Sequence, residues 1–459
     1  MKFYDRNAEL AVLETMQQQA AHAGRMTVMT GRRRVGKTML ALEFVASHRF
    51  LYLFVSKKSE ALLCEELVQE IRSRLRVPVF GEIRRFSDLF ALLIELSRTE
   101  PLAVVIDEFQ ELYSINRGAY SELQRLWDLN KAECKLHVIF IGSVQSLMHR
   151  IFEEAKEPLF GRADRIIVLQ PFPIATVKEI LQDYGVEESE QLFSIWALTG
   201  GLPKYLDILA SSGAMTRDSA LELIISPHSP FLQEGRNLLV EEFGRDYGVY
   251  FSILELIASG KTSRSEIDSI LGVHSGAYLA RLESEYNIIT SVRPLGARPG
   301  SRVVKYAISD NFLIFWFRFI FRNNSAVELG NRAYLREVIE RDWSTWAGKM
   351  LERFFHRVVA ATGRYNRVGG WWDKGSKNEI DLVAVNDLKK SLLAAEIKLN
   401  PARARMADLE RKAERLRESF PGYEITCRIM GLDSLSDPEF APAVVLDPNI
   451  DPMGKNSLP

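Results

Sequence analysis

The stretch that decides the fold reads Gly31-Arg32-Arg33-Arg34-Val35-Gly36-Lys37-Thr38. Its glycines let the backbone turn tightly, so that successive N–H groups can face the phosphates of a nucleotide. We expect Lys37 to reach the β- and γ-phosphates and Thr38 to coordinate Mg²⁺. The helix that begins with Met39 and runs to Ser47 adds the positive end of its dipole. The competing interpretation is a surface loop rich in glycine and arginine.

A second motif, residues 102–110, reads Leu-Ala-Val-Val-Ile-Asp-Glu-Phe-Gln. A buried strand that ends in two carboxylates presents them at the carboxyl edge of a parallel sheet, where such sheets bind ligands. Asp107 is predicted to hold Mg²⁺ through water, and Glu108 to orient and deprotonate the attacking water. The alternative is a strand that simply runs into a polar turn, and a phosphate loop earlier in the chain favours the catalytic interpretation.

The first 210 residues alternate short apolar runs with amphipathic segments, which predicts an α/β fold with a parallel five-stranded sheet. The predicted strands are Thr27–Thr30, Phe50–Val55, Ala103–Ile106, Val138–Ile141 and Ile166–Leu169.

Two polar residues near strand ends are further candidates for the nucleotide site. Ser143 follows a predicted strand between the other two motifs and is expected to sense the γ-phosphate, unless it only caps that strand. Arg162 precedes the fifth strand and is expected to neutralise phosphate charge, within one chain or across a subunit interface. A surface ion pair explains Arg162 equally well.

These motifs resemble the archaeal-type P-loop ATPase family, among the STAND and replication-initiator relatives of the AAA ATPases. The matching segments are Phe3–Leu10, the Walker A and Walker B motifs above, Gly142-Ser143, Gly161-Arg162 and Thr199–Tyr205. The resemblance implies that ATP and Mg²⁺ are the cofactors. It also implies that Arg6 and Pro203 lie near the adenine and ribose, although Arg6 could cap a helix and Pro203 could start one. No separate arginine finger can be named.

Composition narrows the class of protein. The 459 residues have a formal net charge of −1, so charge alone does not indicate nucleic-acid binding. Three cysteines without a CxxC pair indicate reduced thiols and no zinc site. The N-terminus lacks the apolar core of a signal peptide, and the apolar stretch Phe312–Phe321 is too short to span a bilayer. We therefore expect a cytoplasmic protein without a membrane partner.

The chain is predicted to contain several domains. The predicted parts are a P-loop ATPase core at 1–175, a helical lid at 176–244, a winged helix-turn-helix at 245–310, a helical linker at 311–340, an α/β nuclease-like domain at 341–446 and a disordered tail at 447–459. The winged helix-turn-helix is predicted because three short helices are followed by two strands around the turn Pro294–Gly300. The candidate recognition helix Ser275–Glu285 has only one cation, Arg281, beside two glutamates, which favours a packing role over DNA binding.

The C-terminal domain carries a second set of charged residues: Glu352 on a helix at Ser344–Thr362, Asp381 on one strand, and Glu396 with Lys398 on the next. Strand alternation places Glu396 and Lys398 on one face, and a hairpin can bring Asp381 to the same face. The three carboxylates could share a second divalent cation, with Lys398 beside the attacking water.

This Asp…Glu-x-Lys pattern resembles the PD-(D/E)XK nuclease fold. With Gly369-Gly-Trp-Trp-Asp it also resembles the domain of unknown function that commonly follows the archaeal-type ATPase. Glu-x-Lys is common by chance, and such a core can persist as a scaffold without activity. The basic residues of 402–418 fit either a solvated face or a phosphate-tracking surface.

Two functions remain open. The first is an ATP-binding and ATP-hydrolysing AAA/STAND-like switch coupled to a nucleic-acid-processing domain, with DNA or RNA as the partner. The second is an ATPase signalling or scaffold protein whose inactive nuclease-like domain binds protein partners. Oligomerisation is compatible with both. A metabolic enzyme is disfavoured, because the sequence offers no small-molecule catalytic constellation.

Overall fold

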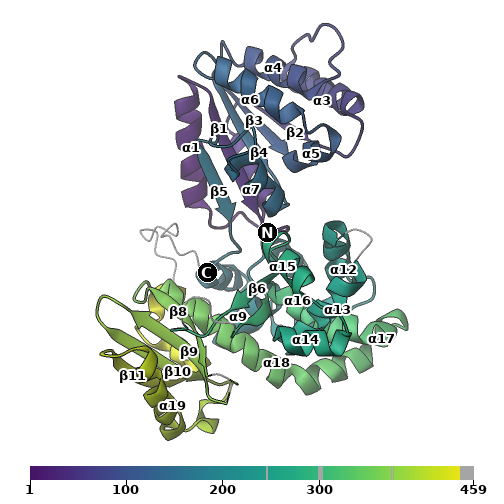
Figure 1. The fold of residues 1–459 in the computed structure, drawn as a ribbon. Coiled ribbons are helices and arrows are strands. Elements are labelled where there is room, and N and C mark those ends of the chain that lie inside the picture. The colour runs from purple at the N-terminus through teal and green to yellow at the C-terminus, as the bar shows by residue number, and fades with distance from the viewer. Residues whose placement is uncertain (244–246, 298–302, 374, 376, 445–459) are drawn as a thin grey trace. The chain divides into compact units, whose positions relative to one another are not determined.

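The computed structural model describes residues 1–243, 247–297, 303–373, 375 and 377–444. These residues form two compact units, one containing Asp5–Gln170 and the other containing Met1–Tyr4 together with the chain from Pro171 onward (Figure 1). The predicted tail at 447–459 and part of the predicted turn Pro294–Gly300 lie outside the described residues. Among the described residues, no helix combines the length and the apolar character needed to cross a bilayer.

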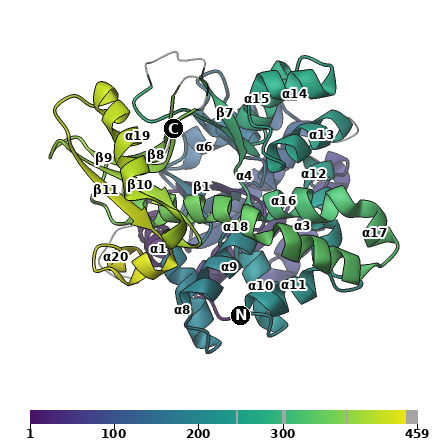
Figure 2. The same cartoon turned by 90° about the horizontal axis from the view of Figure 1, so that it is seen from below.

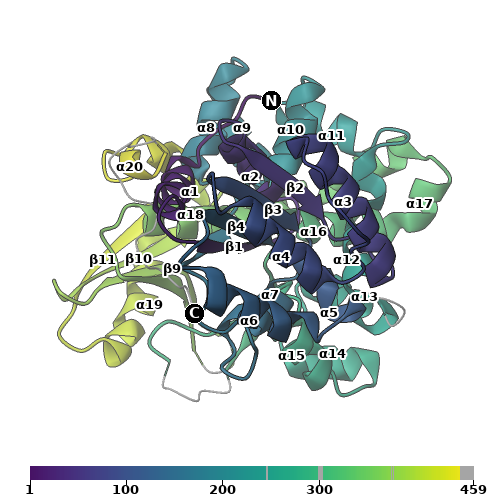
Figure 3. The ribbon, with the colours of Figure 1, turned by 90° about the horizontal axis from the view of Figure 1, so that it is seen from above.

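The first unit is built on five parallel strands in the order β2-β3-β4-β1-β5. Figure 3 labels four of these strands, β2, β3, β4 and β1. These strands are β1 Arg25–Gly31, β2 Phe50–Phe54, β3 Leu102–Asp107, β4 Leu136–Ile141 and β5 Arg165–Leu169. The predicted α/β fold with a parallel five-stranded sheet is confirmed. Since β4 lies between β1 and β3, the ends of the three strands that carry the predicted motifs are neighbours.

Helices cover both faces of this sheet. On one face, buried residues such as Val28, Val104 and Val138 share a core with four helices: α3 Glu60–Leu75, α4 Phe86–Leu96, α6 Ala119–Asn130 and α7 Gln145–Glu153. The opposite face packs against α1 Asn7–Ala20 and α2 Lys37–Val45. Strands buried on both faces must be apolar throughout, which explains why they read as continuous hydrophobic runs.

The second unit begins with the helices predicted as a lid. They are α8 Ile174–Asp183, α9 Ser189–Thr199, α10 Pro203–Ser211, α11 Arg217–Ile224 and α12 Pro230–Phe243. Phe193 and Trp196 of α9 meet the ring of Phe354 edge-on, at centroid distances of 5.7 and 5.2 Å. These helices therefore share an aromatic core with the helix that leads into the C-terminal sheet.

Three helices and a two-stranded antiparallel sheet follow, in the predicted order. They are α13 Tyr247–Ala258, α14 Arg264–Leu271, α15 Gly276–Ser284, β6 Ile289–Val292 and β7 Lys305–Ile308. The hairpin is held against the C-terminal sheet, because the Leu295 N–H donates to the Gly370 carbonyl at 2.9 Å and Lys305 pairs with Glu379 at 2.7 Å. The winged-helix assignment of this segment stays a prediction.

The long helix α18 spans Arg332–Ala361 and begins well before the predicted start at Ser344. Buried Leu335, Val338 and Ile339 continue its apolar stripe toward the N-terminus. The segment before it is helical, as predicted, and includes α16 Asn311–Phe315 and α17 Asn324–Glu328. Figure 2 shows α18 extending from α17 to the C-terminal sheet. A single continuous helix therefore crosses the predicted domain boundary at 340–341.

The C-terminal sheet has four strands in the order β11-β10-β9-β8 and is mixed, since only β10 and β11 are parallel. The strands are β8 Arg367–Trp372, β9 Glu379–Asn386, β10 Ser391–Ile397 and β11 Glu424–Met430. α19 Met406–Ser419 packs on the face that carries Val383 and Ala394. β8 and β11 escaped prediction because β8 contains two glycines and β11 mixes polar with apolar residues.

A buried histidine lies at the centre of the first sheet. His137 of β4 has no exposed surface, and its ring nitrogens lie 2.9 Å from Thr27 Oγ1 and 3.1 Å from Gln17 Oε1. Burial lowers the pKa of His137 to about 3, because a charged imidazole would lose its solvation there.

We predict that this histidine makes the first unit sensitive to acid. Below its ordinary pKa of about 6.5, His137 gains a proton in the unfolded chain but not in the folded one, so stability falls as the pH drops from about 6.5 toward 3. Hydrogen exchange of β4 amides should report a loss of about 2 kcal/mol between pH 7 and pH 5. His137→Gln should remove most of this loss, and an equal loss in both proteins would contradict the assignment.

Candidate functional site

The phosphate loop connects β1 to α2 and is built around positive backbone φ angles. Gly31 has φ 142° and Gly36 has φ 91°, values that side chains with a Cβ rarely adopt. A Cβ on Gly31 would also lie 2.6 Å from the Leu169 carbonyl oxygen of β5. Arg34 takes φ 70° without being glycine, and such strain is typical of ligand-binding loops. Val35 is fully buried and anchors the loop in the core.

Lys37 is folded back onto this loop. Its side chain is buried, and Nζ donates to the carbonyl oxygens of Gly31 at 2.8 Å and Arg32 at 3.1 Å. The helix that it opens has Gly36 at its N-cap and no side-chain cap, which leaves its first N–H groups directed at the loop. Met39, by contrast, is exposed. The Lys37 ammonium and the N-terminus of α2 both carry positive charge, so an anion is favoured at the carboxyl end of β1.

Thr38 and Asp107 meet as the sequence predicts. Thr38 Oγ1 donates to Asp107 Oδ2 at 2.8 Å, and the Glu108 N–H donates to Oδ1 of the same carboxylate at 2.8 Å. Asp107 is only 4% exposed. Hydroxyl and carboxylate oxygens are the donor set that Mg²⁺ prefers, so these residues fit the ion that the motif implies.

Tyr52 is a site residue that sequence reasoning missed. Its hydroxyl donates to Asp107 Oδ2 at 2.8 Å, and burial together with the charge of Asp107 raises the pKa of Tyr52. β2 pairs with β3, and Phe54 lies opposite Asp107 in that ladder. A polar residue two positions before the end of an apolar strand was the available signal.

Glu108 is held by two neighbours. Ser143 Oγ donates to Glu108 Oε2 at 2.8 Å, and Gln110 Nε2 donates to the same oxygen. Glu108 itself has φ 54°, a conformation that turns its side chain out of the strand direction. Ser143 was predicted to sense phosphate, and here it pairs with the candidate base. Gln110, also missed, belongs to the same Asp-Glu-Phe-Gln motif.

The remaining predicted residues of the nucleotide site lie in different places. Arg6 is 5% exposed, and its guanidinium donates to the Gln170 carbonyl at 2.7 Å and lies 3.2 Å from Glu9. Arg162 forms an ion pair with Asp128 of α6 at 3.0 Å. Pro203 is the first residue of α10, in the second unit. The roles of these three residues stay predictions.

In the C-terminal sheet, one lysine joins the two predicted strand carboxylates. Lys398 Nζ lies 2.8 Å from Asp381 Oδ2, 2.9 Å from Glu396 Oε1 and 3.1 Å from the Ile397 carbonyl oxygen. Asp381 Oδ2 also accepts from the Ile397 N–H at 2.8 Å. Burial lowers the pKa of Lys398, but its hydrogen bonds to Asp381 and Glu396 and their negative charges raise that pKa by more. The Lys398 ammonium therefore stays charged.

The antiparallel register explains this meeting. Leu382 pairs with Ala395 in the β9–β10 ladder, so Asp381 and Glu396 are the next opposite residues and share a face. It is the face that α19 covers, because Lys412 of that helix contacts Glu396 Oε2 at 3.0 Å. The predicted register is therefore correct.

Glu352 does not complete the predicted three-carboxylate cluster. Over the described ranges, no group of three or more His, Cys, Asp or Glu side chains could hold a metal ion. Glu352 lies on α18, whereas Asp381 and Glu396 project from the α19 face and are already bound to Lys398. Burial, followed by the charge of Asp381, raises the pKa of Glu352 to about 8, so this carboxyl is protonated at neutral pH.

Two segments of the chain match known protein families. Residues 3–209 match a family described as an ATPase domain predominantly from Archaea, and residues 316–410 match a family described as archaeal and bacterial proteins of unknown function. The protein MJECL04 of Methanocaldococcus jannaschii is 29% identical over 406 residues, which cover 86% of this chain and 87% of that protein. MJ0424 of the same organism is 36% identical over 67 residues, which cover 15% of this chain and 65% of that protein.

Among solved structures, the Walker-type ATPase PABY2304 of Pyrococcus abyssi is similar in fold. It aligns with a TM-score of 0.51 at 20% identity and covers 69% of this chain and 96% of its own. The phosphate loop, the parallel sheet and the family match all indicate a P-loop ATPase fold for residues 3–209. Residues 3–209 therefore match the archaeal ATPase domain family in sequence and have the fold of a P-loop ATPase.

Proposed function

We propose that this protein is a Mg²⁺-dependent, ATP-hydrolysing switch of the AAA/STAND-like class. The observation that carries the proposal is the convergence of Lys37, Thr38, Asp107, Glu108 and Ser143 at the carboxyl ends of adjacent strands. Two carboxylates beside a lysine and the N-terminus of α2 match the needs of a metal-bound triphosphate.

Each residue then has a defined task. Lys37 exchanges its two carbonyl contacts for the β- and γ-phosphate oxygens, and Thr38 and Asp107 hold Mg²⁺, which neutralises phosphate charge when bound. Glu108 accepts the proton of the attacking water, with Ser143 and Gln110 holding its carboxylate in place. Arg6 and Pro203 are proposed to lie near the nucleoside, and Arg162 to assist at the phosphates after leaving Asp128.

The first test removes the phosphate-binding charge. Lys37→Ala should abolish ATP binding or weaken it by more than about tenfold, because a charge-assisted contact to the phosphates is lost. Isothermal titration with a non-hydrolysable ATP analogue and Mg²⁺ measures the effect. Lys135→Ala serves as a control, since its ammonium donates to the Thr99 carbonyl away from this loop. Equal affinity in wild type and Lys37→Ala would remove the assignment.

A second test separates binding from chemistry. Glu108→Gln keeps the shape of the side chain but loses its basicity, so ATP should still bind while turnover falls by at least ~10²-fold. Steady-state phosphate release and nucleotide titration on the same sample measure both quantities. Wild-type turnover in Glu108→Gln would show that another group is the base.

For the C-terminal domain, we propose a nuclease-like, divalent-cation site at Asp381, Glu396 and Lys398. The specific observation is that two carboxylate oxygens and the Ile397 carbonyl oxygen surround one ammonium. Three oxygens around a cation also suit a hard divalent ion, for which Lys398 would have to move aside. Coupled to the ATPase, this domain would process nucleic acid.

The scaffold alternative is also supported by particular contacts. Arg281, the one cation of α15, pairs with Glu285 at 3.0 Å, and the β6–β7 hairpin is bound to β8 through Leu295. A winged unit engaged in this way is poorly suited to reading DNA and well suited to bracing the C-terminal domain. In this function, Lys398 is a permanent counterion and the domain binds protein partners.

A cleavage assay distinguishes the two functions. The full chain should cut labelled DNA or RNA in the presence of Mg²⁺ or Mn²⁺, and Asp381→Asn should reduce cutting by at least ~10²-fold, because a ligand of the cation is lost. Glu108→Gln run in parallel reports whether ATP hydrolysis drives the reaction. Absence of cutting with either metal, with and without ATP, favours the scaffold.

A further inference from the structure

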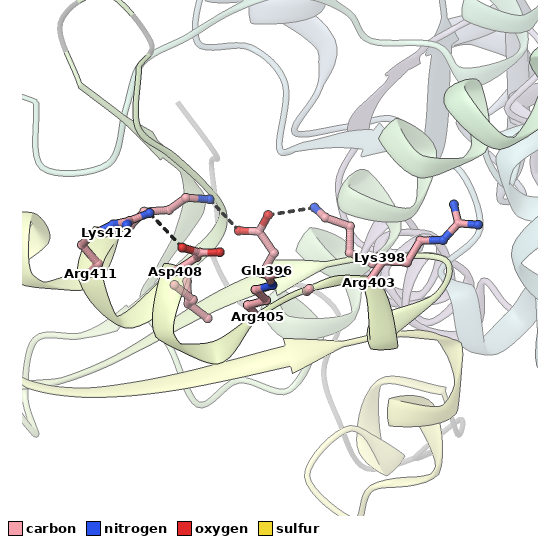
Figure 4. Close-up of a pocket in the computed structure, with 9 residues that line it drawn as sticks. Glu396, Lys398, Arg403, Arg405, Asp408, Arg411 and Lys412 are labelled. Carbon is pink, nitrogen blue, oxygen red and sulfur yellow. Dashed lines mark hydrogen bonds and ion pairs between the residues drawn. The ribbon is translucent and has the colours of Figure 1, made fainter.

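A pocket of about 380 Å³ opens between the end of β10 and the start of α19. Five cations line it: Lys398, Arg403, Arg405, Arg411 and Lys412. Two carboxylates, Glu396 and Asp408, line it as well, which leaves an excess of positive charge. Figure 4 shows Glu396 between Lys412 and Lys398, with Arg403 on the far side of Lys398. Lys412, Lys398 and Arg403 thus follow one another along the proposed cation site.

Within the part of the chain that the structure describes, only some of the cations that line the pocket form ion pairs with carboxylates. Arg411 pairs with Asp408 at 2.8 Å, and Lys412 pairs with Glu396. Among the described residues, neither Arg403 nor Arg405 forms an ion pair, and both are exposed. Acidic partners from the described residues are thus supplied to Lys398, Arg411 and Lys412 and not to Arg403 and Arg405.

The position of these arginines is electrostatically unfavourable for the helix. Arg405 is the N-cap residue of α19, where Ser, Thr, Asp and Asn are preferred, and its side chain makes no cap hydrogen bond. A helix N-terminus carries partial positive charge, so cations there repel it. A bound anion would offset this repulsion and accept hydrogen bonds from the uncapped N–H groups.

We infer that this pocket holds phosphates of a nucleic-acid strand as it passes Asp381 and Glu396. Planar guanidinium groups of Arg403 and Arg405 suit phosphate oxygens, which they can contact in pairs. Five cations line this pocket, so it fits several successive phosphates of a strand better than a single small anion. The inference rests on the proposed nuclease-like function in naming nucleic acid as the ligand.

The structure also separates the basic residues of this segment into two groups. Arg403, Arg405, Arg411 and Lys412 line the pocket, whereas Arg415 pairs with Asp373 and Arg417 lies outside the pocket. Arg417 is exposed, and no ion pair of its guanidinium occurs in the described part of the chain. It is therefore a matched control for Arg405 on the same helix.

The test measures binding under conditions without cleavage. Full-length protein carrying Asp381→Asn, in EDTA and without ATP, is titrated against a fluorescein-labelled single-stranded DNA 30-mer, its duplex and the same RNA. Adding Arg403→Ala and Arg405→Ala should weaken binding to at least one probe by tenfold or more. The slope of log K against log salt should fall by about 1 to 2, as two phosphate contacts are lost. Arg405→Ala alone should weaken binding more than Arg417→Ala.

Several outcomes would overturn the inference. They are no binding of any probe by the parent protein, equal binding by the double variant, and equal effects of Arg405→Ala and Arg417→Ala. Displacement of the probe by poly-glutamate at equal charge concentration would instead identify an acidic protein as the ligand. Failure of the nuclease proposal looks different, because binding would then depend on Arg403 and Arg405 while no metal produces cutting.

Discussion

The insertion of β4 between β1 and β3 is the constraint on which the nucleotide site depends. β1 delivers the phosphate loop, β3 delivers Asp107 and Glu108, and β4 delivers Ser143. In parallel strands all three ends lie at one edge, so the loop, the proposed Mg²⁺ ligands and the candidate base come together without long connections. The same arrangement buries both faces of these strands, which requires helices on each side.

Each charged side chain in this site has specific partners within the protein. Asp107 is satisfied by Thr38, Tyr52 and its neighbour's N–H, Glu108 by Ser143 and Gln110, and Lys37 by loop carbonyls. An unpaired buried charge would cost several kcal/mol, so these contacts stabilise the folded first unit. Nucleotide binding must exchange them, which makes the loaded site a rearrangement of hydrogen bonds that already exist.

The C-terminal sheet uses one lysine for a similar purpose. Asp381 and Glu396 are opposite residues of an antiparallel hairpin, where like charges repel, and Lys398 removes that repulsion. Lys412 then links Glu396 to α19, so the carboxylate pair is connected to the helix that carries the basic pocket. A cation or a phosphate arriving here would compete with an existing ion pair rather than enter a vacant space.

Local sequence determined the elements whose signal is complete within a short segment. The phosphate loop, the five apolar strands and the hairpin register of Asp381 with Glu396 all follow from glycine positions, β-branched runs and alternation, which act between near neighbours. Tertiary structure decided what depends on distant partners. Tyr52 became a site residue only because β2 pairs with β3, and Gln110 because its side chain turns back to Glu108. β8 and β11 became strands because a sheet edge paired with them. Where Glu352 lies relative to the carboxylate pair depends on how α18 packs against the sheet, and no local pattern encodes how a distant helix will pack.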